Sequence, residues 1–255
     1  MCLLVLAWQQ HSRYRLILAG NRDEFHDRPT AAANWWDATD ALAGKDLKAG
    51  GTWLGVSSRG RFGIVTNFRE AAMPSGGLRS RGELICEFLK STESPTAWSA
   101  DVEANGTGYG GFNLIVGDGS ELRYLSNRGP EAKSLPAGVF GLSNRRLDTP
   151  WPKLLRAKKR FGSLIGEDSV DSEALFDMLA DRTRSKDEDL PDTGLPHEWE
   201  QLLSSICIVS PIYGTRASTV LLIGHDGKVF FEERRFDADG QSTGNSQFAF
   251  DTENG

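Results

Sequence analysis

The chain has 255 residues, of which 39% are hydrophobic and 25% are charged, a composition typical of a globular protein with a substantial core. Its formal net charge of −6 argues against a nucleic-acid surface, because such surfaces normally show a clustered basic excess. No run approaches the ~20 apolar residues that span a bilayer, and no charged leader with a cleavage signature is present. We therefore expect a cytoplasmic protein without a membrane span.

Three cysteines, Cys2, Cys86 and Cys207, form a sparse and odd set without metal-ligand spacing. They indicate a reducing compartment and predict no metal site. Because no linker or internal repeat divides the chain, we expect one domain over residues 1–255.

The first 28 residues predict a β-hairpin with a polar cluster at its open end. Residues 2–8 and 14–19 are apolar runs of strand length, and the polar residues 9–13 form the turn. The second strand ends in Asn21-Arg22-Asp23-Glu24, which returns beside the start of the first strand. A guanidinium group and carboxylates are therefore expected near Cys2, where arginine favours the thiolate.

Cys2 has two interpretations. If the initiator Met1 is removed, the thiol and the free α-amine belong to one residue, so the amine can act as base for a cysteine nucleophile. Alternatively, Cys2 is the buried start of a strand, since free cysteine is among the most buried residue types.

The next segments hold a tryptophan pair and a glycine-rich loop. Trp35 and Trp36 either point to opposite sides of an extended segment or form the wall of a pocket for a flat or apolar ligand. Residues 44–55 lack the phosphate-loop spacing and lead into a strand. Their glycines predict close backbone approach near the site.

The middle of the chain predicts strands and helices in alternating groups. A second hairpin ends in Thr66-Asn67, and Ser80-Arg81-Gly82-Glu83 matches the capping box of a helix. The strand at residues 139–144 likewise ends in Ser143-Asn144, and Thr149-Pro150 predicts the start of another helix. The predicted elements are strands at 52–57, 62–66, 112–117 and 121–126 and helices at about 80–91, 95–103, 149–161 and 171–181.

The last part of the chain predicts a loop followed by strands. Residues 182–196 form a surface loop, with His197 as a surface histidine, and strands follow at 204–210, 217–224 and 228–236. The polar tail from about residue 238 is expected to be frayed. Hairpin strands separated by helix pairs predict an α+β fold, a four-layer αββα sandwich of two antiparallel sheets covered by helices.

The polar strand ends supply candidate catalytic residues. Asn67 and Asn144 could donate hydrogen bonds to a developing oxyanion, and Arg216 could bind a carboxylate or secure the site. Each asparagine alone is more often a strand-end residue that bonds its own backbone.

These residues resemble the NRDE family, also called the transport and Golgi organisation protein 2 family, over nearly the whole chain. The motifs are Met1-Cys2, Asn21-Arg22-Asp23-Glu24-Phe25, Arg28-Pro29, Gly50-Gly51-Thr52-Trp53-Leu54-Gly55, Thr66-Asn67, Ser143-Asn144 and Gly214-Thr215-Arg216 with Ser218-Thr219. The layout is similar to N-terminal-nucleophile hydrolases. That similarity implies a site of Cys2, Arg22, Asp23, Asn67, Asn144 and Arg216.

The resemblance points to two functions. One is the binding and trafficking of haem or a similar amphipathic acyl ligand, with haem as cargo and no cofactor required for chemistry. Trp35 or Trp36 would stack on it, Arg22 or Arg216 would pair with propionates, and His26, Cys2 and Met73 are candidate axial ligands. The other is hydrolysis of a linear amide by Cys2. A third hypothesis is an interaction scaffold on an enzyme fold.

Overall fold

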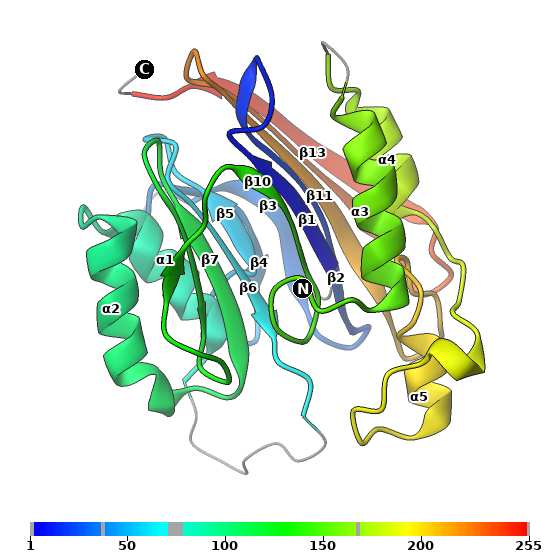
Figure 1. The fold of residues 1–255 in the computed structure, drawn as a ribbon. Helices are drawn as coiled ribbons and strands as arrows, with labels where there is room; N and C mark the ends of the chain where they lie inside the picture. Colours follow the sequence, from blue (N-terminus) through cyan, green and yellow to red (C-terminus); the bar gives the residue numbers. More distant parts are fainter. Residues whose placement is uncertain (1–2, 37–38, 71–78, 167–168, 254–255) are drawn as a thin grey trace.

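The computed structural model describes residues 3–36, 39–70, 79–166 and 169–253, and these build two antiparallel sheets packed face to face (Figure 1). Among these residues, one sheet has six strands in the order β10-β1-β2-β11-β12-β13 and the other has seven, β3 to β9 in sequence order. The strands of the first sheet are β10 (Gly138–Leu142), β1 (Leu3–Trp8), β2 (Tyr14–Phe25), β11 (Tyr213–Gly224), β12 (Lys228–Phe236) and β13 (Ser242–Asp251). Those of the second are β3 (Thr30–Trp36), β4 (Ala41–Asp46), β5 (Leu54–Val56), β6 (Phe62–Asn67), β7 (Phe112–Gly117), β8 (Leu122–Ser126) and β9 (Lys133–Ser134).

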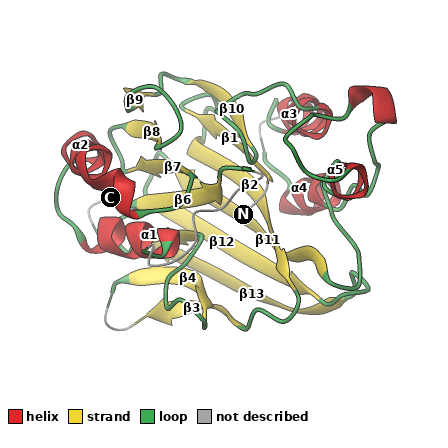
Figure 2. Cartoon of the chain, turned by 90° about the horizontal axis from the view of Figure 1, so that it is seen from below, coloured by secondary structure: helices red, strands yellow, loops and turns green. Residues whose placement is uncertain are grey.

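Helices cover the outer face of each sheet (Figures 1 and 2). Helices α1 (Arg81–Lys90) and α2 (Pro95–Asn105) pack on the seven-stranded sheet, and α3 (Pro152–Leu164) and α4 (Ser172–Leu179) pack on the six-stranded sheet. The expected αββα sandwich is confirmed. None of the described helices is long and apolar enough to cross a membrane.

Strand β1 shows why the layers form. Leu4, Leu6 and Trp8 belong to the core between the sheets, whereas Leu3, Val5 and Ala7 belong to the core under α3 and α4. Successive strand residues point to opposite faces, so a continuous apolar run fills two cores at once. In the hairpin, β1 pairs with β2 so that Leu3 lies opposite Asn21 of the polar cluster.

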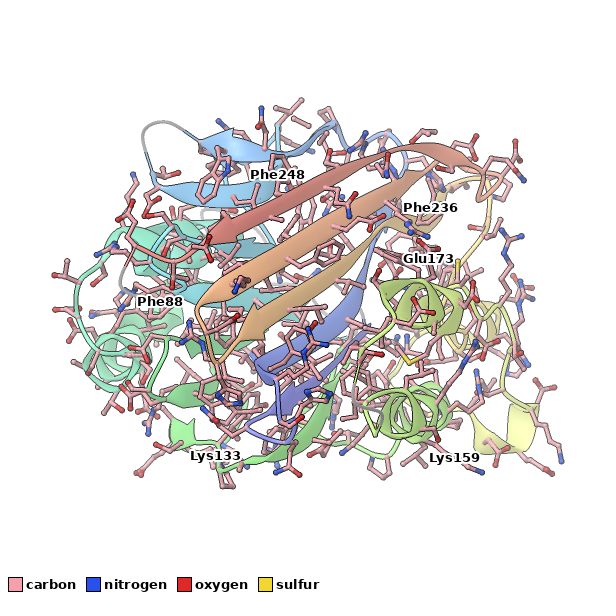
Figure 3. The ribbon with its side chains drawn as sticks, turned by 90° about the horizontal axis from the view of Figure 1, so that it is seen from above. Phe88, Lys133, Lys159, Glu173, Phe236 and Phe248 are labelled. Atoms are coloured by element: carbon pink, nitrogen blue, oxygen red, sulfur yellow. The ribbon has the colours of Figure 1, made fainter. Side chains whose placement is uncertain are left out.

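The C-terminal tail is a strand, so the expectation of a frayed end is wrong. Strand β13 pairs antiparallel with β12, and its half-buried Phe248, labelled in Figure 3, packs with Phe250 against the core between the sheets. Ala249 is the one aliphatic residue of this strand, but its alternation of exposed and half-buried positions is that of an edge strand.

Residues 204–210 were also mispredicted, since they form no strand. The backbone N–H of Cys207 donates to Asp181 O (2.8 Å) and that of Ile208 to Thr215 Oγ1 (2.9 Å), so these donors do not enter a sheet ladder. Cys207 itself is buried.

Two helix predictions also need correction. Helix α3 begins at Pro152 with Trp151 as its N-cap, rather than at Thr149-Pro150. The predicted loop leads into a short helix that was missed, α5 (His197–Leu202), although His197 is on the surface as expected.

Candidate functional site

The buried polar residues of β2 form the base of the site. Asn21, Arg22 and Asp23 are 0%, 3% and 4% exposed, and Leu3 of β1 lies opposite Asn21 in the hairpin. Asn21 Nδ2 donates to the carbonyls of Leu179 and Ile206, both at 2.9 Å. Asn21 therefore anchors the strand, and Arg22 beside it lines the cavity described below, whereas Asp23 does not.

Asp23 is held by a residue from the next strand. Thr215 Oγ1 donates to Asp23 Oδ1 over 2.6 Å and accepts from the backbone N–H of Ile208 at 2.9 Å. The carboxylate is thereby fixed in orientation on the strand that pairs with β1. No local sequence pattern predicts this contact, because Thr215 and Asp23 are 192 positions apart.

Arg22 lies at the centre of the site. Its guanidinium carbon lies 4.3 Å from the ring centroid of Trp53, and Nη2 lies 3.5 Å from Asp46 Oδ2 and 3.8 Å from Glu24 Oε2. Within the described residues its buried Nη1 has no hydrogen-bond partner. Burial lowers the pKa of Arg22, while Glu24 and Asp46 act in the opposite direction. Nη2 of the guanidinium thus lies beside carboxylates, and Nη1 remains as a donor for a ligand.

Asp46 organises the positive charges beside Arg22. Arg28 Nε donates to Asp46 Oδ2 at 2.6 Å, and the backbone N–H of Ala49 donates to Oδ1 at 3.0 Å. Burial alone would raise the pKa of Asp46, but these hydrogen bonds outweigh it and hold the pKa below its usual value. The residue therefore stays a carboxylate at neutral pH.

These groups line a cavity of about 440 Å³, within the range of small-molecule sites. Its lining consists of Arg22, Glu24, Arg28, Asp46, Lys48, Ala49, Thr52, Trp53, Val65, Asn67, Arg79, Ser80, Arg81, Gly82 and Gly110. Five of these side chains are basic and two are acidic. The cavity as a whole therefore favours an anion.

The glycines of the predicted loop do permit close approach. A Cβ atom on Gly51 would lie 2.5 Å from the carbonyl carbon of Gly82, at the start of α1. Ser80, the N-cap of α1, makes no side-chain hydrogen bond to the helix among the described contacts. The start of α1, from Ser80 to Gly82, forms part of the cavity wall.

The two candidate asparagines come together, one from each sheet. Asn144 Nδ2 donates to Asn67 O at 3.0 Å, and Thr66 Oγ1 donates to Ser143 O at 3.0 Å. Asn67 lines the cavity, whereas Asn144 supports it from the end of β10. The structure therefore brings the two residues together, with Asn67 at the cavity and Asn144 behind it.

Arg216 binds backbone beside the cavity. It occupies a bulge between Thr215 and Ala217, and its Nη1 donates to the carbonyls of Phe25, His26 and Arg28 at 3.0, 3.1 and 3.3 Å. It does not line the cavity of Arg22, so it holds the turn after β2.

Of the residues suggested for haem, Arg22 lines this cavity, whereas Trp35, Trp36 and His26 do not. Trp35 packs edge-on against Phe250, with ring centroids 5.0 Å apart, and Trp36 Nε1 donates to Ala43 O at 2.9 Å. His26 Nε2 lies 3.0 Å from Ser210 O. Cys2 and Met73 lie outside the described residues.

Trp53, Asp46 and Arg81 are site residues that sequence reasoning missed. Trp53 stood in a quoted motif, but nothing in sequence linked it to Arg22. The described residues contain no group of three His, Cys, Asp or Glu side chains arranged to hold a metal ion.

Comparisons with known proteins agree on one family. The family model described as Transport and Golgi organisation 2 matches residues 1–238. The Transport and Golgi organization 2 homolog of Mus musculus is 35% identical over 256 residues, covering 92% of each chain. The Homo sapiens homolog is 34% identical over 256 residues, again covering 92% of each chain.

Among solved structures, a Caenorhabditis elegans N-acylethanolamine-hydrolyzing acid amidase ortholog superimposes with a TM-score of 0.52 at 14% identity. The match covers 87% of this chain and 92% of that one. It shows a shared fold.

Proposed function

The chain belongs to the Transport and Golgi organisation 2 family, and we propose that its cavity binds a small amphipathic ligand whose anionic group rests on Arg22. The protein would thereby carry an acyl compound, or haem, in the cytosol. The observation that supports this most directly is the Nη1 of Arg22, which has no hydrogen-bond partner among the described residues although the guanidinium group is buried and held in place.

A buried donor without a partner is unfavourable, and an anionic ligand removes the penalty. The ring of Trp53 and the Asp46 carboxylate fix the guanidinium plane, so little side-chain freedom is lost on binding. Trp53 and Val65 offer apolar surface to the rest of such a ligand.

The mouth of the cavity favours a second negative charge on the ligand. Lys48, Arg79 and Arg81 line it together with the start of α1, where the helix dipole favours negative charge. Acyl compounds that carry a phosphate group, such as acyl-coenzyme A, therefore suit the cavity better than a neutral lipid.

Haem is the less favoured cargo. Its propionates could pair with Arg22, but no His, Cys, Met or Tyr is found among the described residues that line the cavity. A titration of the apo-protein with haem tests this cargo, since a saturable shift of the Soret band at micromolar protein supports it.

The main experiment is a fluorescence titration with dansyl-undecanoate, a carboxylate probe with an apolar tail. Arg22→Lys keeps the charge but loses the flat stacking face, and we expect binding about tenfold weaker, or ~1.4 kcal/mol. Arg160→Lys on the exposed side of α3 is the matched control and should bind like the wild type. The proposal fails if the wild type shows no saturable binding, or if both variants bind equally well.

A second candidate is amide hydrolysis by Cys2. The observation that favours it is the Asp23 carboxylate, which Thr215 holds on the strand paired with β1, because Cys2 directly precedes β1 in the sequence. Such a carboxylate could hold the α-ammonium group of a processed chain.

In that reaction the α-amine takes the thiol proton while sulfur attacks the acyl carbonyl. The C–N bond then breaks, the amine leaves with the proton, and water cleaves the thioester. Asn67 could support the oxyanion.

Intact-mass measurement tests this candidate first, because a retained Met1 blocks the amine and excludes the mechanism. If Met1 is absent, purified protein should hydrolyse an N-acylethanolamine probe, the substrate class named for the nematode structure. Cys2→Ala should abolish that turnover, whereas Cys86→Ala should not.

A further inference from the structure

A buried ion pair connects α5 to the segment that follows β6. Arg69 Nη1 lies 2.7 Å from Glu200 Oε2, and the two side chains are only 8% and 5% exposed. The residues are 131 positions apart in the chain. Such a pair fixes the relative position of two segments, because each charge is costly to leave alone in the interior.

Both charges are further restrained. The guanidinium of Arg69 stacks on Trp151, with its carbon 4.7 Å from the ring centroid. Glu200 Oε1 accepts hydrogen bonds from the backbone N–H of Thr193, at 3.1 Å, and from the Thr193 hydroxyl group. The carboxylate is therefore held by its own loop while it binds Arg69.

Arg69 is connected to the cavity through two hydrogen bonds of Asn144. Its backbone N–H donates to Asn144 O at 2.7 Å, and Asn144 Nδ2 donates back to Asn67 O at 3.0 Å. Asn144 thus binds the 67–69 segment at two points, and Asn67 lines the cavity. The contacts form a continuous path from Glu200 through Arg69 and Asn144 to Asn67.

Helix α5 also touches the other segment of the site. The ring of Trp199 lies 6.4 Å from that of Phe25 and 5.8 Å from that of Tyr213, between centroids. Phe25 ends the strand that carries Arg22 and Asp23. One short helix therefore contacts both chain segments that bring polar groups to the cavity.

We propose that Glu200 is a positioning residue for the cavity, which acts through Arg69 and Asn144 to hold Asn67 in its wall. The 193–202 segment then holds the 67–69 segment in place and is more than a surface loop. This inference rests on the proposed binding function for its effect on affinity. Its effect on the 67–69 segment can be measured without any ligand.

The test is Glu200→Gln, which keeps the shape of the side chain and removes its charge. We expect dansyl-undecanoate to bind about tenfold more weakly and the Arg69 backbone N–H to exchange faster with solvent deuterium. Arg69→Lys keeps the ion pair but not the flat group on Trp151, so it should give a smaller change of the same kind.

Lys153→Met is the matched control. Lys153 is also buried in this region, and its Nζ donates to Leu203 O at 2.8 Å beside α5, but this contact does not run through Arg69. This variant should lose stability yet keep the affinity and the protection of the Arg69 N–H.

The inference is overturned if Glu200→Gln matches the wild type in exchange at Arg69, or if exchange rises equally in all strands. It is also overturned if Lys153→Met reproduces the local effect. If the wild type does not bind the probe, the proposed function fails, while the exchange measurement still decides the positioning role. Should Glu200→Gln not fold, Arg69→Lys carries the same comparison.

Discussion

Thr215 Oγ1 donates a hydrogen bond to Asp23 Oδ1 over 2.6 Å, across 192 positions of sequence. The bond joins β11 to β2 inside the sheet that carries the polar cluster. The same oxygen accepts from the backbone N–H of Ile208, so one hydroxyl group satisfies a carboxylate and a main-chain donor. Its removal should affect both.

Thr215→Val should therefore lower the free energy of unfolding. The valine has nearly the same shape but leaves buried polar partners unsatisfied, at a cost of about 1–3 kcal/mol each. Urea denaturation measures the change. Thr243→Val at an exposed position of β13 is the control and should stay within ~0.5 kcal/mol of the wild type. Equal stability of both variants would show that the Thr215 hydroxyl is dispensable.

Gly44→Ala should destabilise the protein by overpacking. A Cβ atom there would lie 2.5 Å from the Trp53 ring and 2.7 Å from Glu233 Oε2, so the tryptophan under Arg22 has to move. We expect a loss of about 1–3 kcal/mol in unfolding free energy. Dansyl-undecanoate should also bind more weakly.

Gly162→Ala provides the contrast for that experiment. A Cβ atom at this position of α3 meets nothing within 4 Å, and alanine favours a helix. This variant should gain about 0.5–1 kcal/mol. A Gly44 variant as stable as the wild type in the same denaturation series contradicts the close packing of β4 on Trp53.

Asp46→Asn should reduce the acid sensitivity of the protein. The folded pKa of Asp46 is lowered, so its contribution to stability is present above the unfolded pKa of ~3.9 and is lost as pH falls further. The variant should be less stable than the wild type at neutral pH, and this difference in unfolding free energy should become smaller below pH ~4. Urea denaturation midpoints at a series of acidic pH values measure this difference. A difference that does not change with pH would refute the lowered pKa of Asp46.

Glu233→Gln should change the pH dependence of stability in the opposite direction. Glu233 is 1% exposed, and burial raises its pKa, while Ala33 N–H, Arg235 and Arg22 act against the rise. Its stabilising contribution is present below the unfolded pKa of ~4.3 and is lost as pH rises through the folded pKa. The stability of the variant relative to the wild type should therefore increase with pH. A decrease in the same series would contradict the burial of an acid here.

The sequence by itself determined the layers and the position of the polar cluster. A continuous apolar run such as Leu3–Trp8 is typical of a strand that is buried on both faces, so it indicates a sheet between two other layers. The end of β2 and the end of β6 could be recognised because polar residues follow apolar strands at once. These patterns involve residues that are neighbours in the sequence, so they can be recognised without the structure.

Tertiary structure alone decided which of these groups share a cavity and what supports them. Trp53 under Arg22, Thr215 on Asp23 and Glu200 on Arg69 are contacts between segments that no local pattern relates. The same limit explains Ser242–Asp251, where pairing with β12 stabilises a polar segment that has little strand signal of its own. Hydrogen-bond partners and burial come from the packed neighbours of a residue, and only folding brings those neighbours together.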